Sequence, residues 1–390
     1  MRFFRDALLV FASVSVCLLM LEAGMRLGGL KYSASFFTYD PVRQYALRPG
    51  AHGWSEGEGE SYVTINSDGM HDREHAVAKP NGVFRVAFLG DSETNAVHLA
   101  FEENMVQLAQ KELQRDPGNV ELLNFAVGGY TLPEQVYTFR DHAAKYQPDV
   151  VILMLSPAII RSSNRELNTF DTPTPSFILQ DGRLVPDPHD DRFPAPTPRR
   201  LALQNRIFQI INKVRLLSVA RAAVQDGILP RIARARSWFA PKPDRPVYSG
   251  CSCGPPQTAA MEASWQISEA LIAWLAETVR ARHAELWIVS LGDGSQIIPD
   301  PPVRAMYEQR YGTTDLGYSD RRLGEIASRL NIPYLTLAPA LLEYATQHHA
   351  ALRGSGTTAP YEGHLNREGH RAAGPILAAY IRSGVAASRH

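Results

Sequence analysis

The stretch VFRVAFLGDS, residues 83–92, decides the fold of this chain. Residues 83–89 form a nearly unbroken apolar run rich in Val and Phe, which predicts a strand buried on both faces, as in the middle of a parallel sheet. Gly90 permits a tight turn, and the apolar period of residues 106–113 predicts a helix beyond it. Ser92 is therefore predicted at the carboxyl end of a strand, where open α/β sheets bind ligands. Backbone N–H groups at a helix start can hold an oxyanion there.

Four further strands with intervening helices indicate a three-layer α/β/α domain with a five-stranded parallel sheet. These strands are predicted at residues 121–125, 150–155, 286–290 and 334–337. Helices are predicted at residues 132–146, 261–282 and 321–330, and a loop at 292–317. The second strand runs into Gly128 and Gly129, where the backbone can approach a ligand closely, so that an N–H group there faces Ser92. A simple β-to-α turn is the alternative for these glycines.

A histidine motif lies near the carboxyl end, where YEGHLNREGH, residues 361–370, precedes an apolar helix. His364 lies in the turn before this helix, two positions after Glu362. A nucleophilic serine needs an imidazole to take its proton and a carboxylate to orient that imidazole. We therefore predict that Ser92, His364 and Glu362 act together. A capping or surface histidine is the alternative for His364.

The amino terminus predicts a membrane anchor over residues 1–30. Arg2 and Arg5 precede an apolar run at residues 7–21, a pattern that places the body of the protein outside the cytoplasm, as in a bacterial periplasm. A cleaved signal peptide and a buried helix are the alternatives, although the residues around Glu22 fit a cleavage site poorly. The whole chain of 390 residues carries 40 Lys and Arg against 40 Asp and Glu, which indicates no nucleic-acid partner.

The rest of the chain divides into an arm and a domain. Residues 31–80 are predicted as an extended, Gly-rich arm with one strand at 62–65, and residues 81–390 as the α/β domain. An insertion at about 168–260 interrupts the alternation of strands and helices.

This insertion begins with a predicted hairpin at residues 177–185 and continues with a basic, helical segment at 199–238. A solvated helix face is the expected role of the basic residues, with lipid headgroups or an anionic polymer as the alternative. Cys251 and Cys253 in its tail have too few neighbouring ligands to predict a metal site.

Three motifs in this order resemble those of the SGNH/GDSL hydrolases, especially the membrane-anchored bacterial members. They are Gly90-Asp91-Ser92 after the first strand, Gly129 after the second, and EGHLN at residues 362–366 before the last helix. The resemblance implies a flavodoxin-like sheet, no metal or other cofactor, and a Ser-His-acid mechanism through an acyl-enzyme. It also implies that Ser92 is the nucleophile and His364 the base. The backbone N–H groups of Ser92 and Gly129 would bind the oxyanion, and Asp91 would support the turn.

Two departures from the family pattern concern the oxyanion and the acid. The Gly-x-Asn-Asp block expected after the third strand falls at residues 156–159, with Ala158 in place of the Asn that donates to the oxyanion. Losing one such donor costs about 2.7–4 kcal/mol of transition-state stabilisation. The alternative donors are Ser156, Arg161 and Asn164. Many members also place Asp three residues before the histidine, where this chain has Tyr361; Glu362 corresponds to the Asp that others place two residues before it.

The sequence thus predicts an extracytoplasmic serine esterase or deacylase acting on an ester or acyl group. The expected partners are an acylated small molecule or a cell-envelope glycan as substrate, and the membrane through the amino-terminal helix. Two alternatives remain open: an O-acyltransferase of the same fold, and a catalytically degenerate glycan-binding or assembly protein.

Overall fold

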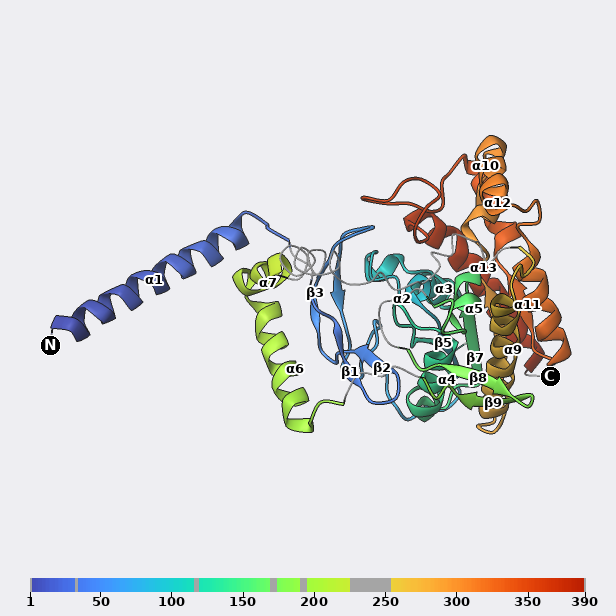
Figure 1. Cartoon of the computed structure of the whole chain (residues 1–390), viewed down its shortest axis with the longest axis horizontal. Helices are drawn as coiled ribbons and strands as arrows, with labels where there is room; N and C mark the ends of the chain where they lie inside the picture. Colours follow the sequence, from blue (N-terminus) through green and yellow to red (C-terminus); the bar gives the residue numbers. More distant parts are fainter. Residues whose placement is uncertain are drawn as a thin grey trace.

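The computed structural model describes residues 2–31, 34–115, 119–168, 174–189, 195–224 and 254–388. A helix at the amino terminus, α1 (Arg2–Leu27), projects away from the body of the protein (Figure 1). It is long and apolar enough to cross a membrane. None of its residues is buried, which excludes the alternative that this apolar segment is a core helix.

One parallel sheet forms the centre of the body, with strand order β11-β10-β7-β5-β6. Its strands are β5 (Phe84–Leu89), β6 (Val120–Asn124), β7 (Val150–Leu155), β10 (Glu285–Ser290) and β11 (Tyr334–Thr336). Read from the other edge, this is the 2-1-3-4-5 order of flavodoxin-like folds. The deciding stretch lies in β5, which pairs in parallel with β6 and β7 on its two sides. The predicted five-stranded parallel sheet is therefore confirmed.

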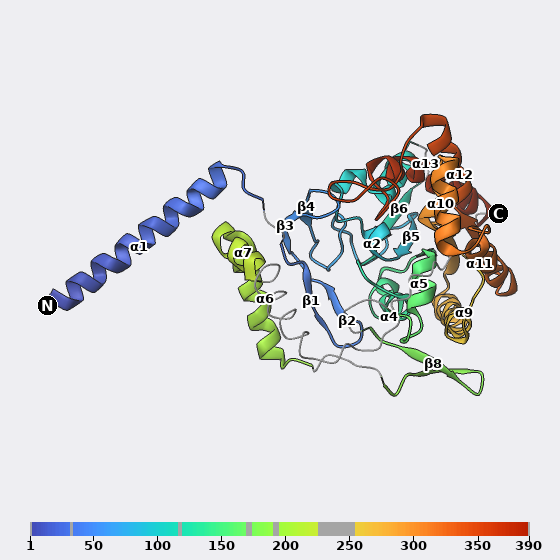
Figure 2. The ribbon, with the colours of Figure 1, turned by 45° about the horizontal axis from the view of Figure 1, so that its top comes forward.

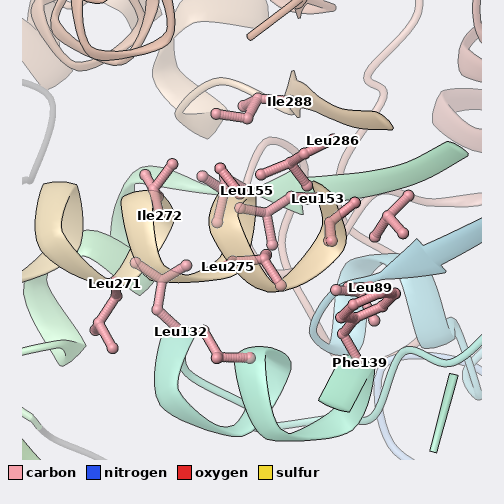
Figure 3. Close-up of a cluster of buried hydrophobic side chains, with 14 of the residues drawn as sticks. Leu89, Leu132, Phe139, Leu153, Leu155, Leu271, Ile272, Leu275, Leu286 and Ile288 are labelled. Atoms are coloured by element: carbon pink, nitrogen blue, oxygen red, sulfur yellow. The ribbon is translucent and has the colours of Figure 1, made fainter. Parts of the chain in front are cut away.

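Helices cover both faces of the sheet, because alternate strand residues point to opposite sides. Ala87 and Leu89 pack into the cluster formed with α4 (Leu132–Asp141), α9 (Ala259–Arg280) and α11 (Tyr318–Arg329). Figure 3 shows apolar side chains of the sheet meeting those of α4 and α9. Val86 and Phe88 pack into the opposite cluster, with α3 (Met105–Leu113), α12 (Ala338–His348) and α13 (Arg367–Ser388). The three-layer architecture is confirmed as well.

The region expected to be a loop at 292–317 contains a helix, α10 (Pro301–Tyr311). Asp300 caps it, since its carboxylate accepts a hydrogen bond from the N–H of Val303 at 3.3 Å. None of the residues of α10 is buried, so no apolar stripe marks the helix in the sequence. The prediction of a loop was wrong for this reason. Short 3-10 turns occur at Phe101–Glu103, Ala143–Tyr146 and Gly294–Ile297.

The arm forms two antiparallel hairpins, of which the sequence predicted only the last strand. The strands are β1 (Phe37–Asp40), β2 (Gln44–Leu47), β3 (His52–Ser55) and β4 (Ser61–Thr64). Each has four residues and pairs only within its own hairpin, so its alternation of side chains is too short to recognise. Val63 and Ile65 pack with Val127 and Tyr130, which follow β6. The arm is therefore packed against the body near the end of that strand.

The insertion begins with the expected hairpin, β8 (Phe177–Gln180) and β9 (Arg183–Pro186). Two helices follow, α6 (Pro198–Lys213) and α7 (Arg215–Ala222), in the segment 199–238 where basic helical structure was predicted; residues 225–238 lie outside the described residues. Figures 1 and 2 place them between α1 and the hairpins of the arm. Cys251 and Cys253 lie outside the described residues.

Candidate active site

Ser92 stands at the end of β5 and at the start of a short helix, α2 (Ser92–Asn95). Asp91 caps this helix, because its Oδ1 accepts a hydrogen bond from the N–H of Glu93 at 3.0 Å. A side chain at Gly90 would clash with Thr94, since its Cβ would lie 2.5 Å from the threonine Oγ1. The sharp turn that presents Ser92 thus depends on the glycine and the aspartate before it.

Ser92 and His364 meet although 272 positions separate them in the chain. The distance between Ser92 Oγ and His364 Nε2 is 2.7 Å. His364 lies in the loop before α13, where a β-bridge joins Arg353 to Leu365. The His364 side chain is 32% exposed and Ser92 is half-buried, so a substrate can reach both.

The carboxylate beside His364 belongs to Glu58, in the loop between β3 and β4. Its Oε2 lies 2.8 Å from His364 Nδ1 and also accepts a hydrogen bond from the backbone N–H of His364 at 2.7 Å. An ionised carboxylate can only accept, so Nδ1 carries the proton and Nε2 presents its lone pair to the Ser92 hydroxyl. The three side chains form a continuous chain of hydrogen bonds in the order of a nucleophile, a base and an orienting acid.

Glu58 reaches His364 because the residue before the histidine, Gly363, has no side chain. Gly363 has a φ of +68°, and a Cβ there would lie 2.6 Å from Oε2 of Glu58. The carbonyl oxygens of Gly57 and Glu58 accept hydrogen bonds from the hydroxyl groups of Thr357, at 3.2 Å, and Ser355. The tip of the β3–β4 hairpin is thereby fixed against the loop that carries His364.

Glu362 does not occupy the position predicted for it. Its side chain is exposed, and the hydrogen bond to Nδ1 of His364 comes from Glu58 instead. The chain turns sharply here, with positive φ at Tyr361 and Gly363, so closeness in sequence does not bring the glutamate to the imidazole. The arm does contain a signal for the acid that was missed: SEGEGE, residues 55–60, places three glutamates among glycines.

The charges around His364 favour its protonated form. Burial lowers the pKa of His364, but the carboxylates of Glu93 and Glu58 outweigh burial and raise that pKa above its ordinary value. The imidazolium that forms when a serine gives up its proton is therefore stabilised at this position.

A buried ion pair joins the helix that begins at Ser92 to the loop that carries His364. The Nη1 of Arg353 lies 2.6 Å from Glu93 Oε1 and donates to the carbonyl of Gly363 at 2.5 Å. The other oxygen of Glu93 accepts from the N–H of Leu365 at 3.0 Å. Burial opposes ionisation, yet Arg353 lowers the pKa of Glu93 to about 2. The pair holds Gly363 and Leu365, the residues on both sides of His364, and so fixes the distance between His364 and Ser92.

Replacing Arg353 with methionine is expected to lower the free energy of unfolding by about 3–5 kcal/mol, because the Glu93 carboxylate stays buried without its cation. A double variant that adds Glu93→Gln removes this charge too and is expected to recover part of the loss. Urea unfolding of the detergent-solubilised chain measures both effects. If Arg353→Met were as stable as the unchanged chain, the ion pair would not have this role.

The loop after β6 lies against the nucleophile turn. The side-chain amide of Asn95 donates to the carbonyl of Ala126 at 2.9 Å, and the N–H of Val127 donates to the carbonyl of Gly90 at 3.3 Å. Gly129, the predicted second oxyanion donor, has a φ of +82°, and a Cβ there would lie 2.7 Å from the hydroxyl oxygen of Tyr45. The loop therefore requires glycine at this position beside the site.

Two of the three side chains considered as replacements for the missing asparagine are engaged elsewhere. Ser156 Oγ donates to Asp91 Oδ2 at 3.3 Å, and Asn164 Nδ2 donates to the carbonyl of Ala260 at 3.1 Å. Position 158 lies in the short helix α5 (Pro157–Ser162). Ser156 and Asn164 are thus held by other partners, and the backbone N–H groups of Ser92 and Gly129 remain the predicted oxyanion donors.

Burial raises the pKa of Asp91 to about 6, and the Glu93 carboxylate adds to the shift.

A second histidine, which the sequence did not single out, supports the loop that carries His364. The ring of His98 lies 5.3 Å from that of His364, centroid to centroid, and its Nε2 is 2.8 Å from the carbonyl oxygen of Leu365. Burial lowers the pKa of His98, so the neutral ring donates from Nε2. These histidines form no metal site: no group of three or more His, Cys, Asp or Glu residues in the described ranges is placed to hold a metal ion.

No protein-family model matches the chain, and neither does any curated protein. Solved structures do match at low identity. The acetyl xylan esterase AlAXEase is 14% identical, with a TM-score of 0.39, and the match covers 77% of this chain and 100% of that one. An acetyl-xylooligosaccharide esterase from Geobacillus is 12% identical, with a TM-score of 0.39, over 76% of this chain and 94% of its own. A member of the lipolytic protein G-D-S-L family from Veillonella parvula is 12% identical, with a TM-score of 0.38, and the match covers 77% of this chain and 99% of that one. The matches thus include the group that the motifs resemble, but values this low assign no activity to this chain.

Proposed function

We propose that this chain is a serine esterase or deacylase of the SGNH type, which cleaves an ester or acyl group through an acyl-enzyme. The observation that carries the proposal is the chain of hydrogen bonds from Ser92 through His364 to Glu58. Three distant parts of the sequence converge to place an accessible hydroxyl on an imidazole that a carboxylate orients. This arrangement favours catalysis over a degenerate binding protein.

The proposed reaction has two halves. In the first, Ser92 Oγ attacks the carbonyl carbon while His364 Nε2 takes its proton; the bond to the leaving alcohol then breaks, and Nε2 returns the proton to that alcohol. In the second, His364 takes a proton from water, which attacks the acyl carbon. The bond to Ser92 Oγ breaks and the serine regains a proton. Glu58 stays ionised and stabilises the imidazolium in both halves.

The proposed oxyanion site consists of backbone N–H groups from Ser92 and Gly129. The first lies at the start of α2 and the second in the loop that packs against the nucleophile turn. The asparagine that usually adds a third donor is absent, and a single donor is worth about 2.7–4 kcal/mol in the transition state. We therefore expect a slower enzyme than family members that retain this asparagine.

We also propose that α1 is an uncleaved anchor and that the body lies outside the cytoplasm. Arg2 and Arg5 precede the apolar segment, as the positive-inside rule requires for this orientation. Glu22 of α1 accepts a hydrogen bond from the N–H of Leu216 in α7 at 2.9 Å, so the helix is joined to the folded body. An acylated glycan or other conjugate of the cell envelope is the substrate that this location favours.

A fluorophosphonate probe tests the proposal. We expect the folded chain in detergent to react and the label to map to the peptide that contains Ser92, because the probe requires a serine activated by its base. Heat-denatured protein is the control and should not react. A folded chain that stays unlabelled would support the degenerate binding protein instead. Supplying a labelled acyl donor with and without glycan separates the esterase from the transferase, since only a transferase yields acylated glycan.

The raised pKa of His364 predicts the acid limb of the pH profile. Only the neutral imidazole can accept the serine proton, so kcat/KM should fall as the pH drops, with a midpoint above the ordinary histidine value of 6.5. Glu58→Gln removes one of the charges that raise this pKa and is expected to move the midpoint to lower pH. Hydrolysis of an uncharged ester, followed across pH for both proteins, measures the shift. An unchanged midpoint in the variant would contradict this electrostatic role.

A further inference from the structure

We propose that the outward face of α6 lies on the surface of the membrane that α1 crosses and contacts anionic lipid headgroups. This inference rests on the membrane anchor proposed above. It is carried by the distribution of side chains on α6, by the charge of residues 198–224 and by the joint between α1 and α7.

Two asparagines of α6 face the protein. Asn205 Oδ1 accepts hydrogen bonds from the hydroxyl of Thr38, at 2.9 Å, and from Nε of Arg48, at 3.2 Å. Asn212 Oδ1 accepts from the N–H of Ser35 at 3.4 Å, and its Nδ2 donates to the carbonyl of Ser35 at 3.2 Å. Two asparagines thus fasten α6 to the arm.

Three apolar side chains of the same helix face outward, whereas Phe208 faces the arm, with its ring centroid 4.5 Å from the guanidinium of Arg48. Leu203, Ile207 and Ile210 are 59%, 44% and 57% exposed. Their spacing of four and three residues places them along one side of the helix. An exposed apolar stripe of this kind marks a surface that is covered by something other than water.

Basic residues accompany this stripe. Residues 198–224 carry six Lys and Arg and no Asp or Glu. Arg199, Arg200 and Arg206 are exposed on α6 together with the apolar side chains. Leucine and isoleucine flanked by arginine is the composition of helices that lie in the plane of an anionic membrane, with apolar groups below the headgroups and guanidinium groups among them.

Hydrogen bonds between α1 and α7 fix the position of the outward face of α6 relative to the bilayer surface. Glu22, directly after the apolar run of α1, accepts from the N–H groups of Arg215 at 3.1 Å and Leu216 at 2.9 Å. In return, Arg215 donates to the carbonyl of Met25 at 2.6 Å, and Arg26 donates to the carbonyl of Lys213 at 2.8 Å. The end of a membrane-spanning segment lies at the bilayer surface, so these bonds hold the end of α6 there. Figures 1 and 2 show α6 and α7 on the side of the body that α1 leaves.

Site-specific fluorescence of the full chain in lipid nanodiscs tests the inference. The three cysteines, Cys17, Cys251 and Cys253, are replaced by serine, and one cysteine is introduced at a time for an environment-sensitive dye. Ile207→Cys reports on α6, Val10→Cys on the anchor, and Met306→Cys, 66% exposed on α10, serves as the matched control. Thermal unfolding of each variant shows whether it folds. The nanodiscs contain phosphatidylcholine with phosphatidylglycerol.

We expect the dye at positions 10 and 207 to be blue-shifted and quenched by nitroxide-labelled lipid, and the dye at position 306 to be quenched only by an aqueous quencher. Lipid quenching at 207, but not at 10, should decrease when phosphatidylglycerol is omitted. Lipid contact at 10 with aqueous quenching at 207 would overturn the inference and leave the anchor intact. Aqueous quenching at both would overturn the anchor and with it the inference. Protection of 207 from both quenchers would also overturn it, because a second copy would then cover α6.

Discussion

Replacing Ser92 with alanine is expected to abolish ester hydrolysis, with kcat falling on the order of 10⁴–10⁶-fold. The variant lacks the oxygen that attacks the carbonyl carbon, while the imidazole and the backbone donors remain. The Ser92 hydroxyl contacts the half-exposed His364 loop rather than the apolar core, so the fold should persist. Initial rates on a simple acetyl ester and thermal unfolding, measured on the same preparation, separate the two effects.

The combined effect of replacing Ser92 and His364 tests whether the two side chains act together. Ser92 and His364 act as one unit, so a double variant with His364→Ala should be hardly slower than Ser92→Ala alone. A Ser92→Ala chain with the activity of the unchanged protein would refute acyl transfer through this residue. Losses that multiply in the double variant would show instead that the two side chains work independently.

The second large effect concerns the acid. Glu58→Gln is expected to lower kcat on the order of 10³–10⁴-fold, because a neutral amide does not stabilise the imidazolium and its NH2 group can donate to Nδ1, which favours the wrong tautomer. Glu362→Gln is the matched control: the same substitution, on an exposed glutamate two residues from His364, should leave kcat unchanged. Steady-state kinetics of the two variants under one condition makes the comparison.

The opposite result is easy to recognise. If Glu362→Gln were the slow variant and Glu58→Gln the unaffected one, the carboxylate predicted from sequence spacing would be the functional one, and the contact between Glu58 and His364 would be incidental. A further variant, Glu58→Asp, keeps the charge on a shorter side chain. It should retain more activity than Glu58→Gln if charge and not only the hydrogen bond matters.

The centre of the sheet could be predicted from sequence because its strands β5, β7 and β10 are almost wholly buried. Strands of this kind appear as apolar runs that end in turn residues, as 83–89 and 150–155 do. The place of Ser92 follows from the same logic, since ligands bind at the carboxyl ends of parallel strands. His364 lies in the loop before α13 and was predicted from its own motif instead. Local patterns therefore led to the nucleophile and the base.

The acid could not be predicted in this way, because it reaches the site through tertiary packing of short elements. Glu58 is 306 positions from His364 and is carried by a hairpin of four-residue strands, which has no long periodic signal. The buried ion pair of Glu93 and Arg353 also forms through tertiary packing, and no local sequence pattern predicts that these two residues meet. Contacts that depend on how the arm and the carboxyl-terminal loop pack were outside the reach of local patterns.

Under the proposed mechanism, the position of Glu58 makes the arm part of the active site. A shortened protein that starts at residue 81 would keep the whole sheet, Ser92 and His364, and would look complete by its motifs. It would nevertheless be a serine and histidine dyad, because the glutamate that polarises the base would have been cut away with the arm. A recombinant protein that lacks everything ahead of the recognisable fold would therefore be a slow catalyst. The low activity would result from the truncation and not from the native protein.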